Sequence, residues 1–190
     1  RSYNGLVFKD SIMVRYKTAP ITGEPPAWNP SEYSDLERQI RLYHAASFGN
    51  GNYGGLTTNS ITRIKASSKA AGHRIAPTGG EFTASSNSIS ITNNWQNTGI
   101  APTYDNWCIF YELVSSTGVV TQLGVSSFKL RLFHQVATKS HTDVFPLTVA
   151  AGTYTLRMVI KDANGYRLPL PLQIQGRNSD GSYNIKTFQR

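Results

Sequence analysis

Short alternating strands separated by turns occupy the chain after about residue 80, and this pattern restricts the fold more than any other feature of the 190-residue sequence. Within residues 153–160 the alternation places Tyr154, Leu156 and Met158 on one face of a strand. Gly, Ser, Asn and Ala cluster between such segments, as turns require. Spacing of this kind, without helical periodicity, predicts an antiparallel β-sandwich.

The expected strands of the sandwich follow one another at short intervals. They lie at 88–95, 107–114, 119–123, 127–133, 144–147, 153–160, 171–175 and 183–188. The expected turns lie at 116–118, 150–152, 163–165 and 179–182. We therefore assign residues 76–190 to the sandwich.

The beginning of the chain carries a helix signal instead. Asn29-Pro30-Ser31-Glu32 has Asn as an N-cap, Pro at the first helical position and Glu closing a capping box. The apolar residues that follow recur at spacings of three and four, which predicts one buried face on a helix ending near Ala46. These residues are Tyr33, Leu36, Ile40 and Tyr43.

A second helix is expected at 60–71, with Gly72 as its left-handed cap. Apolar segments at 6–8 and 12–14 are expected to be strands. Strands and helices that alternate in this way are typical of an α/β unit, so residues 1–75 are assigned to an α/β appendage with about two helices.

The charge and the cysteine content exclude some classes of protein. The formal net charge is +8, but the basic residues are scattered with no run of three, so a nucleic-acid partner is not expected. The charge is interpreted as a solvated surface, with attraction to an acidic polymer as the alternative. The single Cys108 lies in an apolar strand and is interpreted as a small buried hydrophobe. No apolar run approaches the roughly 18 residues of a membrane span, and Arg1–Gly5 does not resemble a signal peptide. The missing initiator Met suggests a processed chain or an excised piece.

The loop between the expected strands 88–95 and 107–114 is rich in aromatic residues. Trp95 is in register with Ile89 and Ile91 and is expected in the core. Tyr104, Asp105 and Trp107 are candidate ligand-binding residues, because an aromatic ring can pack on the apolar face of a sugar while polar neighbours bind its hydroxyls. The alternative for Trp107 is a buried indole in register with Ile109, Tyr111 and Leu113.

Two further aromatic residues, Trp28 and Tyr53, lie in loops rich in Pro, Gly and Asn. Such loops give their rings little local reason to be buried, and the glycines around Tyr53 allow a ligand to approach the backbone. Both residues are therefore candidate ligand-binding residues, with burial as the open alternative.

A set of ordered motifs between about Gly72 and Phe188 resembles the C-terminal domain of unknown function that bacterial secreted proteins carry downstream of a glycosidase-like (β/α) barrel. The motifs are 72–75, 95–104, Trp107, 128–132, 152–156 and 165–172. Residues 23–26 and 43–47 resemble the last strand and helix of such a barrel more weakly. The resemblance implies an immunoglobulin-like sandwich associated with polysaccharide metabolism.

Catalytic and metal sites have little support in the sequence. Glu24 would end a barrel strand, where glycosidases carry their carboxylates, but these enzymes use two acids and about 250 residues of barrel. The four histidines show no metal-ligand spacing, so no catalytic residue, no metal and no cofactor are predicted. A structural calcium ion could use Asp105 or Asp162.

The sequence thus predicts a non-catalytic carbohydrate-binding or accessory module of a polysaccharide-active secreted protein. The expected partners are a polysaccharide or oligosaccharide and a neighbouring catalytic domain, without nucleic acid or a membrane span. The expected location is secreted or on a bacterial cell surface. The alternatives are the C-terminal part of a glycoside hydrolase whose barrel lies upstream, and a purely structural packing domain.

Overall fold

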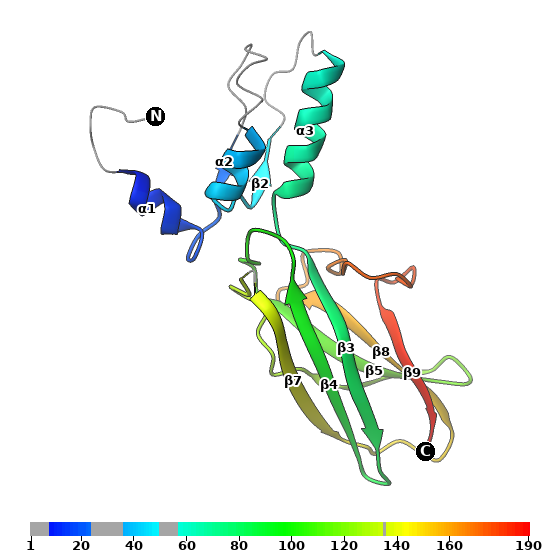
Figure 1. Ribbon diagram of the computed structural model, residues 1–190. Coiled ribbons are helices and arrows are strands. Elements are labelled where there is room, and N and C mark those ends of the chain that lie inside the picture. Colours follow the sequence, from blue (N-terminus) through cyan, green and yellow to red (C-terminus); the bar gives the residue numbers. More distant parts are fainter. Residues whose placement is uncertain (1–7, 24–35, 50–56, 135) are drawn as a thin grey trace. The chain divides into compact units, whose positions relative to one another are not determined.

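A computed structural model describes residues 8–23, 36–49, 57–134 and 136–190 of the chain (Figure 1). The chain divides into two compact units. The helical unit consists of Arg1–Arg74, Asn97–Tyr104 and Leu132–Gln135. The sandwich unit consists of Ile75–Gln96, Asp105–Arg131 and Val136–Arg190.

The strands of the sandwich unit form two antiparallel sheets, which confirms the predicted mainly β sandwich. One sheet has the order β3-β4-β7 and the other has the order β6-β5-β8-β9. The bounds are β3 (Ile75–Ala84), β4 (Ser88–Asn97), β5 (Trp107–Ser115), β6 (Val120–Val125), β7 (Val136–Pro146), β8 (Thr153–Asp162) and β9 (Tyr183–Gln189). The closer assignment to an immunoglobulin-like fold stays a prediction.

The core of the sandwich follows from strand register. β5 and β8 pair antiparallel without a shift from Trp107 opposite Asp162 to Ser115 opposite Tyr154. Alternate residues of this pair are at most 2% exposed; they are Ile109, Tyr111, Leu113, Leu156, Met158 and Ile160. From β4, Ile89, Ile91 and Trp95 are equally buried, so the predicted core position of Trp95 is confirmed. Each large apolar side chain buried in this way contributes about 1.5–3 kcal/mol.

Two expected strands are wrong. Residues 127–133 are irregular, and side chains take the backbone N–H groups at the start of this segment: Ser127 N donates to Asp143 Oδ1 and Phe128 N donates to Ser126 Oγ. Residues 171–175 are also irregular, since Leu172 N donates to Tyr183 Oη and Pro171 has no N–H to offer. The other six predicted strands are confirmed with changed bounds: the strand expected at 119–123 is Val120–Val125, and the one expected at 144–147 is the end of Val136–Pro146.

Strand β3 was not expected from the sequence. It contains Pro77, Gly79 and Gly80, which are typical of turns rather than strands. β3 lies at the outer edge of its sheet, where a missing backbone donor is tolerated. Cys108 also departs from its predicted burial, because it lies on the outward side of β5 and is only half-buried.

The helical unit contains α1 (Phe8–Arg15), α2 (Leu36–Leu42) and α3 (Thr58–Ala70). Its short strands β1 (Thr22–Gly23) and β2 (Ser47–Phe48) pair in parallel. The core of this unit consists of Leu36, Ile40, Ala45, Ala70 and Ile100. No helix among the described residues is long and apolar enough to span a membrane.

The predicted strand at 12–14 is wrong, because these residues belong to α1. Ile12 and Val14 are 45% and 54% exposed, so no neighbouring strand covers them, and a helix satisfies its own backbone hydrogen bonds. Of the other predicted strand, Phe8 starts α1 and residues 6–7 lie outside the described chain.

The helix ends show how local sequence sets the other elements. α3 begins after Thr57, whose Oγ1 accepts from Ser60 N, so it starts two residues before the predicted position. Gly72 has φ of 85°, as predicted for a left-handed cap residue. The helix-start signature at 29–32 lies outside the described residues.

α2 ends at Leu42 instead of near Ala46. His44 follows with φ of 51°, and Ala45 N bonds to Ile40 O while His44 N bonds to Arg41 O. This is the Schellman arrangement that ends helices, with His44 in the position that usually holds Gly.

Candidate functional site: a tyrosine loop and an edge groove

The most exposed aromatic residue described lies in the loop after β8, residues 162–168, which we call the tyrosine loop. Tyr166 is 89% exposed and Leu168 is 86% exposed. The carboxylate of Asp162 accepts hydrogen bonds from the backbone N–H groups of Asn164 and Tyr166. Gly165 bonds to the carbonyl of Asp162 and has φ of 73°, a left-handed conformation that favours Gly. The exposed ring is therefore carried by a turn of fixed shape.

An ion pair ties the tyrosine loop to the residues before β5. Arg167 Nη1 donates to Asp105 Oδ2, and Ala163 N donates to Asn106 O. The two charged side chains are 56% and 45% exposed, so they remain accessible to a ligand. A guanidinium and a carboxylate thus lie in the loop segments that flank an exposed tyrosine.

The predicted aromatic loop at 103–107 does not form a single surface. Tyr104 belongs to the helical unit, whereas Asp105 and Trp107 belong to the sandwich unit. Trp107 is only 6% exposed, which corresponds to the buried alternative. Its indole Nε1 is buried without a hydrogen-bond partner in the described part of the chain. Whether these residues bind a ligand stays a prediction.

Tyr104 is held in place within the helical unit. Its hydroxyl donates to the carbonyl of Tyr16 at 2.8 Å. Burial raises the pKa of Tyr104 to about 12, with a smaller contribution from Tyr16. The Tyr104 phenol is half-buried and neutral, and its proton is already hydrogen-bonded. Such a side chain contributes to packing more than it offers a surface for stacking against a sugar. The other predicted residues, Trp28, Tyr53 and Glu24, lie outside the described residues.

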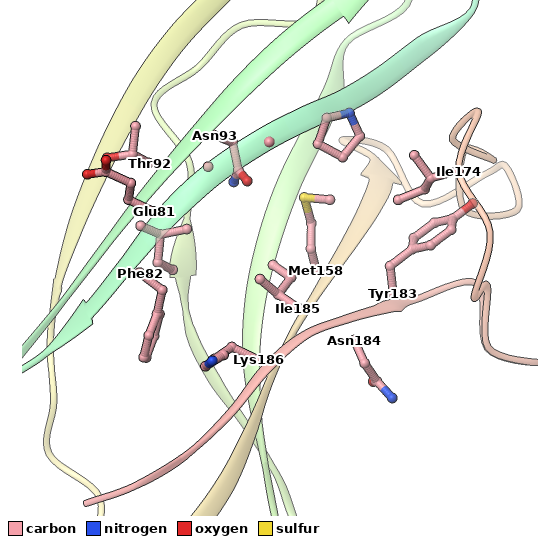
Figure 2. A pocket seen from close by; sticks show the side chains of 14 residues that line it. Glu81, Phe82, Thr92, Asn93, Met158, Ile174, Tyr183, Asn184, Ile185 and Lys186 are labelled. Carbon is pink, nitrogen blue, oxygen red and sulfur yellow. The ribbon is translucent and has the colours of Figure 1, made fainter.

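A second feature is a cavity of about 450 Å³ between β3 and β9, the outer strands of the two sheets (Figure 2). We call it the edge groove. It is lined by Pro77, 79–82, 91–93, Met158, Ile174 and 183–186. A Cβ at Gly80 would lie 2.1 Å from the carbonyl oxygen of Thr92, so the close approach of β3 to β4 requires Gly there.

The inner wall of the edge groove is apolar except for one amide. Ile91, Met158 and Tyr183 are 1–3% exposed, and Asn93 is 8% exposed. Asn93 occupies an inward position of β4, in register with Ile91 and Trp95, where an apolar residue is the rule. Its Nδ2 donates to Tyr111 Oη at 2.6 Å. Among the described residues, no group donates to its Oδ1.

The side chains around the Asn93 amide decide which hydrogen-bonding groups the edge groove offers to a ligand. Burial and the nearby Asp143 raise the pKa of Tyr111, so its hydroxyl stays neutral. Tyr183 Oη accepts a hydrogen bond from Leu172 N at 2.8 Å, so this hydroxyl is already engaged with the protein backbone. Glu81 and Lys186, of opposite charge, lie on β3 and β9 at the two sides of the edge groove (Figure 2). The groove therefore offers an apolar inner wall that carries one acceptor, Asn93 Oδ1, and a rim with one acidic and one basic side chain.

A serine, a histidine and an aspartate also meet in the sandwich unit. His141 Nε2 lies 3.0 Å from Ser127 Oγ and 3.2 Å from Asp143 Oδ1, and Asp143 Oδ2 accepts from Ser126 Oγ at 2.5 Å. A catalytic triad uses one ring nitrogen for the nucleophile and the other for the acid. Here the same nitrogen faces both groups, so the cluster is a structural link between β7 and residues 126–128.

The other buried carboxylate is also committed to structure. Glu112 bonds to Arg157 at 2.7 Å and to Lys161 at 3.0 Å, and Arg157 pairs with Asp180. No group of three or more potential His, Cys, Asp or Glu ligands occurs among the described residues. Of the two candidate calcium ligands, Asp105 pairs with Arg167 and Asp162 holds the tyrosine loop.

The helical unit brings two of the histidines together. His44 Nδ1 lies 2.6 Å from the carbonyl of Ile100, and its ring stacks on Tyr16 at 3.8 Å. Tyr16 also makes an edge contact with His134 at 5.8 Å. Burial, with Lys17 and His44 nearby, lowers the pKa of His134. These contacts explain why a His is kept at a position that favours Gly.

Neither the tyrosine loop nor the edge groove was predicted from the sequence. A signal for the first was present, because the predicted turn at 163–165 is followed by Tyr166 outside any expected strand. A signal for the second was Asn93, a polar residue in an otherwise apolar alternation. The openness of the groove depends on β3, which was not expected, and could not be predicted.

No protein-family model and no curated protein matches the sequence. Solved structures with some similarity include β-glucosidase 3B from Thermotoga neapolitana, with 12% identity over 62% of this chain and 17% of that chain, and a TM-score of 0.36. The β-glucosidase from Kluyveromyces marxianus has 14% identity over 62% and 13%, with a TM-score of 0.38. The putative ApaA protein from Bordetella pertussis has 15% identity over 62% and 92%, with a TM-score of 0.31.

The matched part of the chain thus spans less than a fifth of either β-glucosidase. TM-scores at this level do not identify a fold or an activity.

Proposed function

We propose that this chain is a non-catalytic carbohydrate-binding module that keeps a polysaccharide-active protein close to its glycan. The observation that carries the proposal is Tyr166, an 89% exposed ring on a turn held by Asp162 and Gly165. The ring lies next in sequence to Arg167, which pairs with Asp105. This combination provides the two kinds of group that a sugar requires.

The physical basis is the two-sided character of a sugar ring. One face of a pyranose presents C–H groups, which pack against the negative face of an aromatic ring, and its edges carry hydroxyls. Arg167 can donate to those hydroxyls and Asp105 can accept from them. Because the turn is already fixed, binding orders few additional groups, and the entropic cost of association is lower than for a mobile loop.

The accessory role and the secreted or cell-surface location are part of the same proposal. They rest on the motifs between Gly72 and Phe188 that resemble domains attached to glycosidase-like barrels. Both buried carboxylates described, Glu112 and Asp143, already have fixed partners in the sandwich. This supports a binding role over a catalytic one for the sandwich unit.

The experiment is affinity electrophoresis and calorimetry of the 190-residue chain against a panel of plant, algal and microbial polysaccharides. Tyr166→Ala is expected to weaken binding about tenfold or more. The reference is the stacking of a nucleobase, a ring of comparable area, on an aromatic side chain, which is worth about 1–3 kcal/mol. Tyr166→Phe keeps the ring and should retain most of the affinity. Val144→Ala, at a residue that is 66% exposed on β7, is the matched surface control.

Two results would overturn the proposal. One is the absence of retardation by every glycan of the panel. The other is glycan binding that Tyr166→Ala leaves unchanged while Val144→Ala lowers it. The first result would favour the structural packing alternative, for which the neighbouring exposed Leu168 provides an apolar contact.

A further inference from the structure

We propose that the edge groove binds the acetamido group of an N-acetylated sugar. This inference rests on the proposed glycan-binding function and names the class of sugar. The groove shares no residue with the tyrosine loop, so the two sites can be tested independently.

The first step is the hydrogen-bonding capacity of Asn93. Its amide nitrogen already donates to Tyr111 Oη at 2.6 Å, and its Oδ1 accepts from none of the described residues. The residue is 8% exposed, and Figure 2 shows it on the wall of the cavity. Asn93 Oδ1 is not among the fully buried polar atoms without a partner, so solvent reaches it from the cavity, and a ligand that displaces this solvent has to replace its hydrogen bond. Such a ligand must bring an N–H or O–H donor.

The second step is the surface beside this acceptor. Ile91 and Met158 line the same cavity and are 1% and 2% exposed. A hydroxyl placed against them would lose its hydrogen bonds to water without replacement. A methyl group there would instead bury apolar area. The groove thus favours a donor that has a methyl group close by.

The third step is the match to a chemical group. An acetamido substituent carries an N–H donor and a methyl on the two ends of a slim, planar amide. Glu81 and Lys186 give the rim opposite charges, so the groove as a whole favours a neutral substituent. A plain hydroxyl of a neutral hexose supplies the donor without the methyl, and a uronic acid adds a charge that only Lys186 would favour.

The experiment compares two series of oligosaccharides that differ only in this substituent. Calorimetry measures the affinity of the 190-residue chain for β-1,4-linked N-acetylglucosamine oligomers and for glucose oligomers of equal linkage and length. The acetylated series is expected to bind at least about tenfold more tightly, since one methyl in an apolar pocket discriminates by about 10- to 200-fold. Equal affinities would overturn the inference, as would tighter binding of a 6-deoxyhexose or a uronic acid oligomer.

A pair of variants tests whether Asn93 carries the preference. Asn93→Leu removes the acceptor, and the preference for the acetylated series should fall to within about twofold. Tyr111→Phe removes the same Asn93–Tyr111 hydrogen bond but leaves Oδ1 in the edge groove, so the preference should remain. Equal loss in both variants would show that the hydrogen bond acts only through structure and would overturn the role of Asn93.

A measurement on the unmodified chain keeps the inference testable if Asn93→Leu does not fold. Saturation-transfer NMR with N-acetylglucosamine oligomers should give the strongest saturation on the acetyl methyl protons. Saturation confined to the C–H protons of the ring would place the sugar on an aromatic surface and overturn the inference.

The tyrosine loop separates this inference from the proposed function. Tyr166→Ala should weaken both series by the same factor, because a ring that packs on a sugar face does not sense the substituent. If neither series nor any other glycan binds, both ideas fail. If glycans bind and Tyr166→Ala weakens them without any preference for the acetylated series, the glycan-binding function stands and only the acetamido site fails.

Discussion

Two loops at the same end of the β5–β8 strand pair present their aromatic residues in opposite ways. Trp107 lies opposite Asp162 in the pairing of the two strands, and Tyr166 follows four residues after Asp162. Trp107 is 6% exposed and Tyr166 is 89% exposed, although the Arg167–Asp105 pair joins their loops. The aromatic residue next to a core strand is buried, and the one that follows a turn is presented to solvent.

The comparison shows that register decides exposure and that the chemical character of a loop does not. Trp107 is the first residue of β5 on the side that carries Ile109 and Tyr111, so the alternation of the strand directs it inward. Tyr166 has left the sheet after the Asp162–Gly165 turn, and no strand alternation acts on it. An aromatic residue is therefore a candidate for ligand binding when it lies beyond the end of a strand.

The largest expected effect separates the two residues by stability. Trp107→Ala is expected to lower the free energy of unfolding by about 3–5 kcal/mol, because a buried indole leaves a cavity. Tyr166→Ala is expected to change it by less than about 0.5 kcal/mol, as for other exposed positions. Urea unfolding followed by circular dichroism measures both. A destabilised Tyr166→Ala variant with an unaffected Trp107→Ala variant would reverse the comparison.

The pH dependence of stability tests the burial of the Tyr104 hydroxyl in the 103–107 segment. The pKa of Tyr104 is raised to about 12, whereas a tyrosine in the unfolded chain titrates near 10. The stability linked to its proton is complete below pH ~10 and is lost as the pH rises toward 12, because the unfolded chain releases this proton first. Tyr104→Phe should therefore flatten the fall in urea midpoint across this window.

The control for this measurement is the pH range from 7 to 9, where wild type and Tyr104→Phe should differ by a constant amount. That constant reflects the lost hydrogen bond to the Tyr16 carbonyl. An identical slope for both proteins above pH ~10 would contradict the burial of the Tyr104 hydroxyl.

The core could be predicted from the sequence because alternation is a local signal. Ile89, Ile91 and Trp95 were placed correctly by their period of two alone. The segment at 12–14 could not, since three apolar residues in a row fit a strand or a helix equally and only the absence of a covering sheet decides. The irregular course of 127–133 depends on Asp143, which is distant in sequence and captures the backbone of Ser127.

The candidate site was less predictable, because it also depends on contacts between residues that are distant in sequence. The edge groove requires β3, and β3 contains Pro77, Gly79 and Gly80, which locally indicate a turn. Its position as an edge strand is a property of the whole sandwich. The Arg167–Asp105 pair joins residues 62 positions apart, and no local pattern reveals such a contact.

A smaller effect is expected from replacing the indole of Trp107 with a phenyl ring, which removes the buried N–H. Its N–H is buried without a partner in the described part of the chain, and such a group costs about 1–3 kcal/mol. Trp107→Phe loses packing volume but also removes this penalty, so the net change should stay within about 1 kcal/mol. Trp95→Phe is the matched control, because Trp95 is 1% exposed and its nitrogen is not among the unpaired buried atoms.

The control variant should be the more destabilised of the two, as measured by urea unfolding under the same conditions. If Trp107→Phe costs more than Trp95→Phe, the indole N–H of Trp107 has a favourable partner. Trp107 would then be held in place by a polar contact as well as by its inward position on β5.

The smallest expected effect is the coupling between Asp105 and Arg167, which joins the two loops. A double-mutant cycle with Asp105→Asn and Arg167→Gln should give about 0.2–1 kcal/mol at low salt, because the side chains are 45% and 56% exposed. In 0.5 M NaCl the coupling should become smaller, since exposed charges are screened. A coupling above about 2 kcal/mol that resists salt would mean that the pair sets the shape of the tyrosine loop. With the weak coupling expected here, Asp162 and Gly165 hold the turn, and the Asp105 and Arg167 side chains are free to exchange their ion pair for contacts with a ligand.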